Sequence, residues 1–174
     1  MKILCGCTAA LIAVLTLGGC SDNTEPAQND TQAQNDALAQ DDTDDTAESV
    51  WMTDFEAAKA KADQEGKDLL MDFSGSDWCY WCQRLDEEVF SRQGFIDEAG
   101  RDFVFVKIDF PSDKSGQSQA LQQQNDRLAR NYGIQGYPTI ILARPDGTEY
   151  ARTVYREGGP DAYLDHLQQL RQER

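Results

Sequence analysis

The chain has 174 residues and a formal net charge of −15 at pH 7. Nine acidic residues and no basic residue lie between positions 21 and 49, whereas residues 50–174 carry 22 acids and 15 bases. This acidity argues against nucleic-acid binding. The length of residues 50–174 suits one compact domain.

Residues 1–19 have the composition of a secretory signal peptide. A single cation, Lys2, precedes the apolar stretch Ile3 to Leu17, and a short positive region followed by an apolar core is typical of such signals. The stretch is shorter than the roughly 20 residues that span a bilayer comfortably. The following Leu17-Gly18-Gly19-Cys20 resembles the lipobox of bacterial lipoproteins, in which the signal is cut before a cysteine that becomes lipidated. A plain signal peptide with an unmodified Cys20 is the alternative.

Residues 20–49 are expected to be a lipidated cysteine followed by a disordered acidic tether. The segment has too few apolar residues to fold, and its charge repulsion favours an extended chain. In Gram-negative lipoproteins an aspartate directly after the lipidated cysteine favours retention in the inner membrane. Here Ser21 takes that position and Asp22 comes second. The resemblance implies a lipid-anchored protein that faces the periplasm, with the outer membrane favoured over the inner membrane.

Residues 50–174 alternate between helical and strand patterns. Thr53 and Glu56 form a possible capping box for a helix that Gly66 ends, and Pro160 opens a last helix with apolar residues on one face. The other predicted elements are strand 68–73, a helix from 79 to about 92, strand 103–109, helix 118–132, strand 139–143, a turn at 144–147 and a partner strand at 149–155. This order predicts an α/β domain whose sheet has a parallel half and an antiparallel half, flanked by helices.

Two cysteines, Cys79 and Cys82, stand at the transition from the strand at 68–73 to the next helix. Their spacing allows a disulfide within one helical turn. The unpaired N–H groups and the positive end of the dipole at a helix start favour a thiolate at Cys79, and a thiolate is the species that attacks disulfides. A zinc site would need four ligands, and a structural disulfide over this spacing would constrain the unfolded chain little. Thiol–disulfide chemistry is the preferred interpretation.

Two motifs together resemble those of the thioredoxin superfamily. The first is Trp78-Cys79-Tyr80-Trp81-Cys82 after the strand at 68–73, and the second is Gly136-Tyr137-Pro138-Thr139 before the strand at 139–143. The resemblance covers nearly all of residues 51–174. Within the superfamily, Phe73 to Cys79 and Arg84 to Phe90 are similar to exported bacterial thioredoxin-like domains. The resemblance implies a thioredoxin-like fold, an α/β architecture with a mixed sheet flanked by helices.

The resemblance also implies catalytic roles. Cys79 is the attacking cysteine, exposed at the helix start, and Cys82 is the shielded resolving cysteine. Pro138 matches the family's cis-proline beside the cysteines. Asp72 matches a buried acid that assists proton removal from the second cysteine; the alternative is a strand-end aspartate that faces solvent. Lys107 could pair with Asp72 from the adjacent strand or point outward.

Several residues around the cysteines are candidates for binding substrate. The backbone of Tyr137 could pair with an extended substrate segment. Trp78, Tyr80 and Trp81 are candidate substrate-binding residues that form an apolar platform, although Trp78 could instead pack in the core. The loop at 110–118 could contact a partner or be a tolerated insertion. We expect His166 to be a surface residue without a catalytic role.

The sequence thus predicts a membrane-tethered, periplasm-facing thiol–disulfide oxidoreductase that reduces disulfides of exported proteins. The cysteine pair is the electron carrier, so no dissociable cofactor and no metal are expected, and a membrane reductase could supply electrons. The dipeptide Tyr80-Trp81 departs from the Gly-Pro of thioredoxin, which leaves the direction of electron flow open. A dithiol oxidase and a non-catalytic binding module on the same scaffold are the alternatives.

Overall fold

The computed structural model describes residues 50–174. The predicted signal peptide at 1–19, the lipidated Cys20 and the tether lie outside the described residues. Among residues 50–174, no helix is long and apolar enough to cross a membrane.

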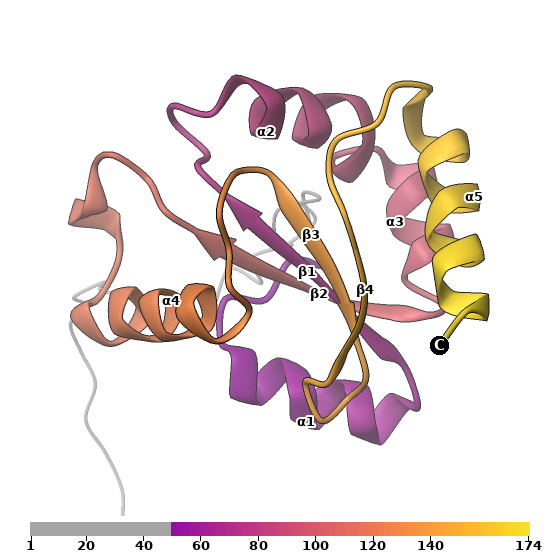
Figure 1. The fold of residues 1–174 in the computed structure, drawn as a ribbon, viewed down its shortest axis with the longest axis horizontal. Helices are drawn as coiled ribbons and strands as arrows, with labels where there is room; N and C mark the ends of the chain where they lie inside the picture. The colour runs from indigo at the N-terminus through magenta and orange to yellow at the C-terminus, as the bar shows by residue number, and fades with distance from the viewer. Residues whose placement is uncertain (1–49) are drawn as a thin grey trace, which may run out of the picture. The chain divides into compact units, whose positions relative to one another are not determined.

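Four strands form one mixed sheet in the order β2-β1-β3-β4 (Figure 1). β1 runs parallel to β2 and antiparallel to β3, and β3 runs antiparallel to β4. The central strand β1 is buried along its whole length, which is typical of a strand covered on both faces. The strands are β1 (Asp68–Ser74), β2 (Phe103–Asp109), β3 (Thr139–Ala143) and β4 (Glu149–Thr153).

Helices cover both faces of the sheet. One apolar core joins α1 (Phe55–Glu65) and α4 (Gln119–Asn131) to the first face. The other joins the second face to a group of four helical segments. That group contains α2 (Tyr80–Leu85), the π-helical turn η2 (Asp86–Phe90), α3 (Gln93–Ala99) and α5 (Gly159–Gln172). The short helix η3 (Lys114–Gly116) lies in the loop before α4.

Strand alternation decides which side chains face α2. Leu69, Met71 and Phe73 pack toward α1 and α4, whereas Leu70 packs on the opposite side. Successive side chains of a strand point to opposite faces, so Asp72 shares the face of Leu70. One polar strand residue is thereby placed under the helix that carries Cys82.

The strands at 103–109 and 139–143 are confirmed, as is Gly66, whose φ of 66° ends α1 in the left-handed conformation. The predicted N-cap residue of α1 was wrong by one position. The carboxylate of Asp54, and not the hydroxyl of Thr53, accepts a hydrogen bond from the amide of Ala57. The single helix predicted from 79 to about 92 is divided into α2 and the π-helical turn η2, and α3 was not predicted. Phe95, Ile96 and Ala99 bury α3 against the core, so packing stabilises a helix of only seven residues.

Candidate active site

Cys79 and Cys82 form a disulfide at the start of α2. Cys79 is the N-cap residue in an extended conformation, and its sulfur accepts the amide of Cys82 at 3.3 Å. Only 6% of Cys79 and 4% of Cys82 is exposed. The predicted shielding of Cys82 is confirmed, but the predicted exposure of Cys79 is wrong for this disulfide form. The disulfide and the amide of Cys82 draw the Cys79 sulfur against the first turn of the helix, where solvent reaches little of it.

The aromatic residues beside the cysteines are exposed. Trp78, Tyr80 and Trp81 expose 52%, 59% and 47% of their surface. The alternative of Trp78 as a core residue is therefore wrong. Its indole nitrogen donates to the carbonyl of Phe110 at 2.8 Å, and a Cβ built on Gly75 would lie 2.4 Å from the indole ring. Glycine at position 75 is what allows the indole to lie over the backbone.

The segment before Cys79 is hydrogen-bonded to the loop at 110–118. The carboxylate of Asp77 accepts the amides of Ser112 and Asp113, at 2.8 Å for the shorter bond to Ser112. These amides lower the pKa of Asp77 below its ordinary value. Ser76 donates through its amide and its hydroxyl to the carboxylate of Asp109, at 2.9 and 2.6 Å. These hydrogen bonds therefore fix the backbone segment that leads into Cys79.

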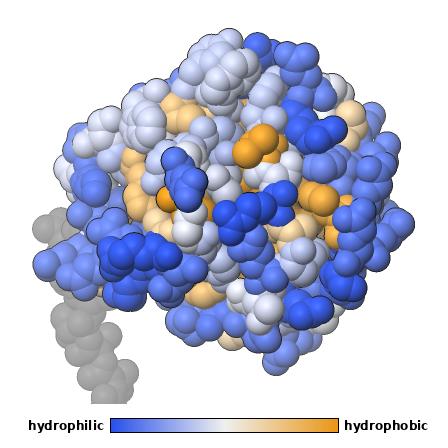
Figure 2. Space-filling model, viewed as in Figure 1, coloured by the Kyte–Doolittle hydropathy of each residue, from blue (hydrophilic) through white to orange (hydrophobic). Residues whose placement is uncertain are grey.

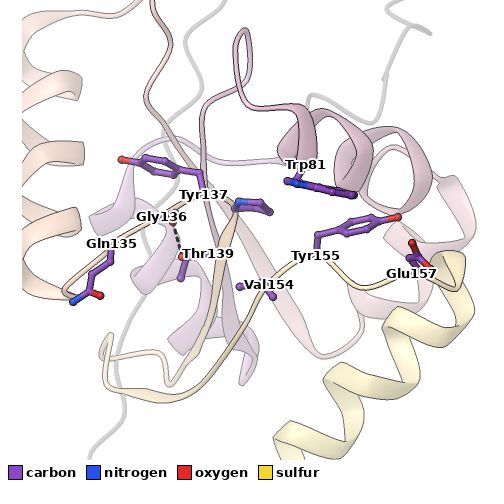
Figure 3. A pocket seen from close by; sticks show the side chains of 9 residues that line it. Trp81, Gln135, Gly136, Tyr137, Thr139, Val154, Tyr155 and Glu157 are labelled. Atoms are coloured by element: carbon purple, nitrogen blue, oxygen red, sulfur yellow. Dashed lines mark hydrogen bonds between the residues drawn. The ribbon is translucent and has the colours of Figure 1, made fainter.

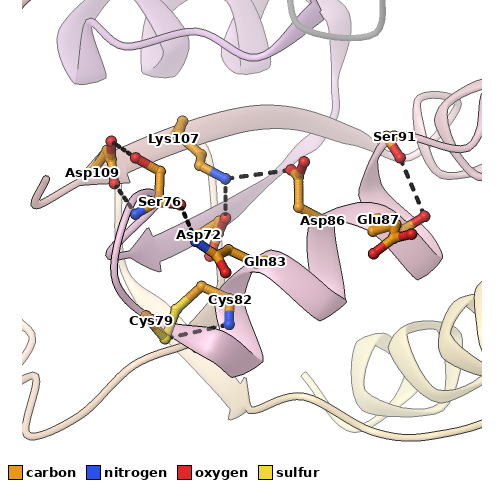
Figure 4. A network of polar contacts seen from close by, with 10 residues as sticks. All are labelled: Asp72, Ser76, Cys79, Cys82, Gln83, Asp86, Glu87, Ser91, Lys107 and Asp109. Atoms are coloured by element: carbon orange, nitrogen blue, oxygen red, sulfur yellow. Dashed lines mark hydrogen bonds and ion pairs between the residues drawn. A yellow bond between two sulfur atoms is a disulfide. The ribbon is translucent and has the colours of Figure 1, made fainter.

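Asp72 is buried beneath α2, not solvent-facing. Its position in β1 is paired in register with Lys107 in β2, and the ammonium of Lys107 lies 2.9 Å from its carboxylate (Figure 4). Its Oδ1 atom has no hydrogen-bond partner. Burial raises the pKa of Asp72, against the opposing effect of the Lys107 charge. The predicted pairing of Lys107 with Asp72 is confirmed, and the raised pKa makes this carboxylate a stronger base than an exposed aspartate.

Lys107 connects this pair to a cavity beside Cys82. Its ammonium lies 3.5 Å from Asp86, which is on the helical turn after Cys82. A cavity of about 670 Å³ is lined by Cys82, Asp86 and Lys107 among other residues. Burial opposes the charge of Lys107, but the nearby carboxylates of Asp72, Asp86 and Asp109 together outweigh burial and raise the pKa of Lys107. The resolving cysteine and Lys107 thus line one cavity, and Lys107 links that cavity to the buried carboxylate of Asp72.

Pro138 follows a cis peptide bond to Tyr137, as the resemblance implies. The Tyr137 ring packs edge-on against Trp78, with ring centres 5.6 Å apart, and burial raises the pKa of its phenol. A groove of about 650 Å³ extends from this point. Figure 3 shows the side chains that line it: Trp81, Gln135, Gly136, Tyr137, Pro138, Thr139, Val154, Tyr155 and Glu157.

A profile of the thioredoxin-like domain family matches residues 55–168. The chain belongs to this family. The match agrees with the sheet order and the helical layers, so the predicted thioredoxin-like fold class is confirmed.

Relatives of this thioredoxin-like domain include two proteins of Chlamydia pneumoniae. The disulfide bond reductase DsbH of Chlamydia pneumoniae is 31% identical over 104 residues, 60% of this chain and 62% of the relative. The thioredoxin-related protein DsbJ of the same organism is 31% identical over 114 residues, 66% of this chain and 31% of the relative. A solved structure of a DsbH oxidoreductase is 27% identical, with a TM-score of 0.66 over 71% of this chain and 85% of that one. The match spans less than two thirds of both sequence relatives.

Two features of the thioredoxin-like domain were missed or misjudged from the sequence. Tyr155 stacks on Trp81 with ring centres 5.2 Å apart, although position 155 was predicted only as the end of a strand. The sequence offered one indirect signal: Arg84 and Glu88 are spaced four apart in a predicted helix, which indicates an ion pair. In the structure Glu88 also accepts a hydrogen bond from the Tyr155 hydroxyl. His166 is not fully at the surface: it is partly buried and its Nε2 lies 2.9 Å from the Thr153 hydroxyl. Burial lowers its pKa.

Metal binding has no candidate among the described residues. Across positions 50–174, no three His, Cys, Asp or Glu side chains gather closely enough to hold a metal ion. The chemistry available at the site is that of the two sulfur atoms, the buried carboxyl and the groove.

Proposed function

We propose that this chain is a thiol–disulfide oxidoreductase that reduces disulfides in exported proteins. The observation that carries the proposal is the Cys79–Cys82 disulfide at the N-terminus of α2, where amide groups and the helix dipole favour a thiolate once the bond is reduced. Relatives whose names include disulfide bond reductase and oxidoreductase support this class of reaction.

The proposed reaction uses the reduced dithiol. The Cys79 thiolate attacks one sulfur of a substrate disulfide, and the other substrate sulfur leaves with the electron pair and takes up a proton. Cys82 then loses its proton, attacks the Cys79 sulfur and releases the second substrate thiol. The dithiol thereby gives two electrons to the substrate and is oxidised to the Cys79–Cys82 disulfide. We assign Asp72 the role of accepting the Cys82 proton, since the buried carboxyl and Cys82 lie on the same face of the sheet (Figure 4).

The proposed substrate site is the surface around the disulfide. Trp78, Tyr80 and Trp81 expose aromatic rings beside Cys79, and the Tyr137 backbone precedes Pro138 at the groove. In this proposal an extended substrate segment pairs with the backbone of Tyr137, in the manner of strand addition, while Pro138 presents no competing N–H group.

The proposed location depends on residues 1–49. We propose that signal peptide 1–19 is removed, that Cys20 carries lipid, that residues 20–49 are a tether and that domain 50–174 faces the periplasm, with the outer membrane favoured. Replacing the lipidated residue (Cys20→Ser) should move the protein from membranes into the soluble periplasmic fraction. Membrane association that persists in this variant would contradict lipid anchoring.

Reduction of insulin disulfides with dithiothreitol tests the activity. The wild-type protein should accelerate the reaction, and Cys79→Ser should not. The reduction potential decides the direction: a value near −270 mV supports a reductant, whereas a value near −120 mV would indicate a dithiol oxidase. Absence of cysteine-dependent turnover would indicate a binding module.

Cys82→Ser should trap the partners. Without the resolving thiol, mixed disulfides on Cys79 should accumulate, because no neighbouring thiol displaces the substrate. Mass spectrometry of the trapped proteins should identify exported substrates and a membrane reductase that supplies electrons. Cys79→Ser is the matched control and should trap neither class.

A further inference from the structure

The apolar surface of residues 50–174 gathers beside the disulfide. The four large apolar side chains that are most exposed in this range are Trp78, Tyr80, Trp81 and Val154. Three of them flank Cys79 in sequence, and Val154 lines the same groove as Trp81. The face seen in Figure 2 is mostly hydrophilic, with small hydrophobic patches scattered over it. Apolar patches of this kind mark interaction sites.

One wall of the groove is an aromatic stack that hydrogen bonds to an ion pair hold in position. The rings of Trp81 and Tyr155 lie face to face at an interplanar angle of 30° (Figure 3). The Tyr155 hydroxyl donates to Glu88 at 2.7 Å, and Glu88 in turn accepts from the Nε atom of Arg84 at 2.8 Å. Tyr80 packs edge-on against Trp81 at 5.0 Å and also accepts from Arg84. The ion pair therefore holds the rings in place before any substrate arrives.

The charge at the groove is acidic. Glu157 is its one charged lining residue, and it makes no ion pair within the described part of the chain. Asp126 lies close enough to Tyr137 for its charge to add to burial in raising the pKa of that phenol. Arg84 is neutralised by Glu88. A basic side chain on the partner would therefore complement the groove.

We propose that this groove selects substrate segments that carry an aromatic or large aliphatic residue close to the reactive cysteine, with a basic residue two positions beyond it. The inference rests on the proposed function and adds its substrate class. Trp81 and Tyr155 are the specificity-determining residues, and Arg84 and Glu88 are positioning residues that act through Tyr155. In an extended segment, residues two positions apart share a face, so the apolar residue stands two positions from the cysteine.

Single-turnover exchange on short peptides tests the proposal. Each peptide carries one cysteine in a mixed disulfide with thionitrobenzoate, and Phe or Ser two positions before or after it. The full-length protein is first reduced. Its Cys79 thiolate attacks the peptide sulfur, coloured thionitrobenzoate leaves with the electron pair, and Cys82 displaces the peptide thiol. The cysteamine–thionitrobenzoate disulfide has the same leaving group and no side chain for the groove.

The wild-type protein should react at least about fivefold faster with the better-placed Phe peptide than with its Ser counterpart. Tyr155→Ala should lower this ratio about three- to tenfold. Tyr155→Phe keeps the ring but loses the bond to Glu88, so its ratio should fall by about twofold, as should that of Glu88→Ala. Tyr150→Phe is the matched control: it also removes a hydroxyl bound to a carboxylate, that of Asp68, and should leave the ratio unchanged.

A second set of peptides tests the charge. A peptide with Lys two positions beyond Phe, on the side away from the cysteine, should react about twofold faster than the same peptide with Gln there, and Glu157→Gln should remove this difference. Equal rates for Phe and Ser peptides, with rapid reaction of the cysteamine disulfide, would overturn the substrate class and leave the proposed function standing. If no disulfide reacts faster than with the Cys79→Ser variant, the proposed function itself fails.

Discussion

Asp72 is the residue at which burial and charge oppose each other most directly. The residue is 2% exposed, and its carboxyl has one oxygen without a partner, while Lys107 contacts the other oxygen. An unpaired buried oxygen disfavours the charged form. Burial therefore raises the pKa of Asp72 above its ordinary value of 3.8, and the folded chain holds this proton more tightly than the unfolded chain does.

We predict that Asp72→Asn stabilises the protein at pH 7. Where the folded pKa of an acid is raised, the native state binds more protons than the unfolded state, so stability falls as pH rises from the unfolded to the folded pKa. Asn removes this loss, so the free energy of unfolding at pH 7 should rise, while Asp86 still lies beside the Lys107 ammonium. Urea denaturation from pH 4 to pH 8 measures it.

The matched control for Asp72→Asn is Asp97→Asn, an exposed aspartate in α3, which should change stability by less than about 0.5 kcal/mol. A loss of stability at pH 7 in Asp72→Asn would mean that the ion pair with Lys107 outweighs the burial of the carboxylate.

At the scale of elements, two loops far apart in sequence act as one support for α2. Asp77 binds the amides of Ser112 and Asp113, and Trp78 binds the carbonyl of Phe110. Gln117 and Asn125 donate to the carbonyl of Asp109 from the other side, each at 3.0 Å. The loop at 110–118 is therefore held between the redox segment and α4.

We predict that Asp77→Ala loosens this loop. The amide protons of Ser112 and Asp113 lose their acceptor and should exchange with solvent several-fold faster, as measured by NMR. These amides lower the pKa of Asp77 below its ordinary value of 3.8. The stabilising contact between Asp77 and the loop is therefore fully present above pH 3.8 and is lost as the pH falls through the lower pKa of the folded state. Asp63→Asn, on exposed α1 surface, should leave both exchange rates unchanged. Unchanged exchange in Asp77→Ala would mean that the loop is held by its other contacts.

Across the whole domain, the end of β1 remote from the cysteines is joined to the C-terminal helix. Asp68 is 3% exposed and contacts Arg171 at 3.2 Å, Arg174, and the Tyr150 hydroxyl at 3.0 Å. Arg171 also contacts Asp102 at 2.7 Å. These contacts hold α5 against the sheet by charge as well as by its apolar face.

We predict that the double variant Arg171→Met, Arg174→Met loses about 3 kcal/mol of stability, because it leaves a buried carboxylate without a cation. Chemical denaturation measures the loss. Arg101→Met removes an exposed pair with Glu98 and should change stability by less than about 0.5 kcal/mol. Exchange rates at the disulfide should stay unchanged in both. A double variant as stable as Arg101→Met would mean that water and the Tyr150 hydroxyl are enough to stabilise the buried Asp68 carboxylate.

Local patterns were sufficient for most elements of residues 50–174. The strands at 103–109 and 139–143 have continuous apolar runs whose length and β-branched content favour strands, and both bounds are correct. The cysteine pair at a helix start also follows from local sequence, since Cys79 is the N-cap of α2. Hydrophobic periodicity and capping act within a few residues, so they are visible in a single sequence.

Tertiary packing alone decided the remaining features. α3 forms because three of its side chains are buried, and Cys79 is shielded because its sulfur is drawn against the amide of Cys82. Asp72 meets Lys107 through strand register, and Tyr155 meets Trp81 across more than seventy residues of chain. The amino-acid sequence determined the redox pair and the order of the strands, because those depend on neighbours in the chain. The buried carboxyl of Asp72 and the aromatic wall depend on neighbours in space, which register and burial select.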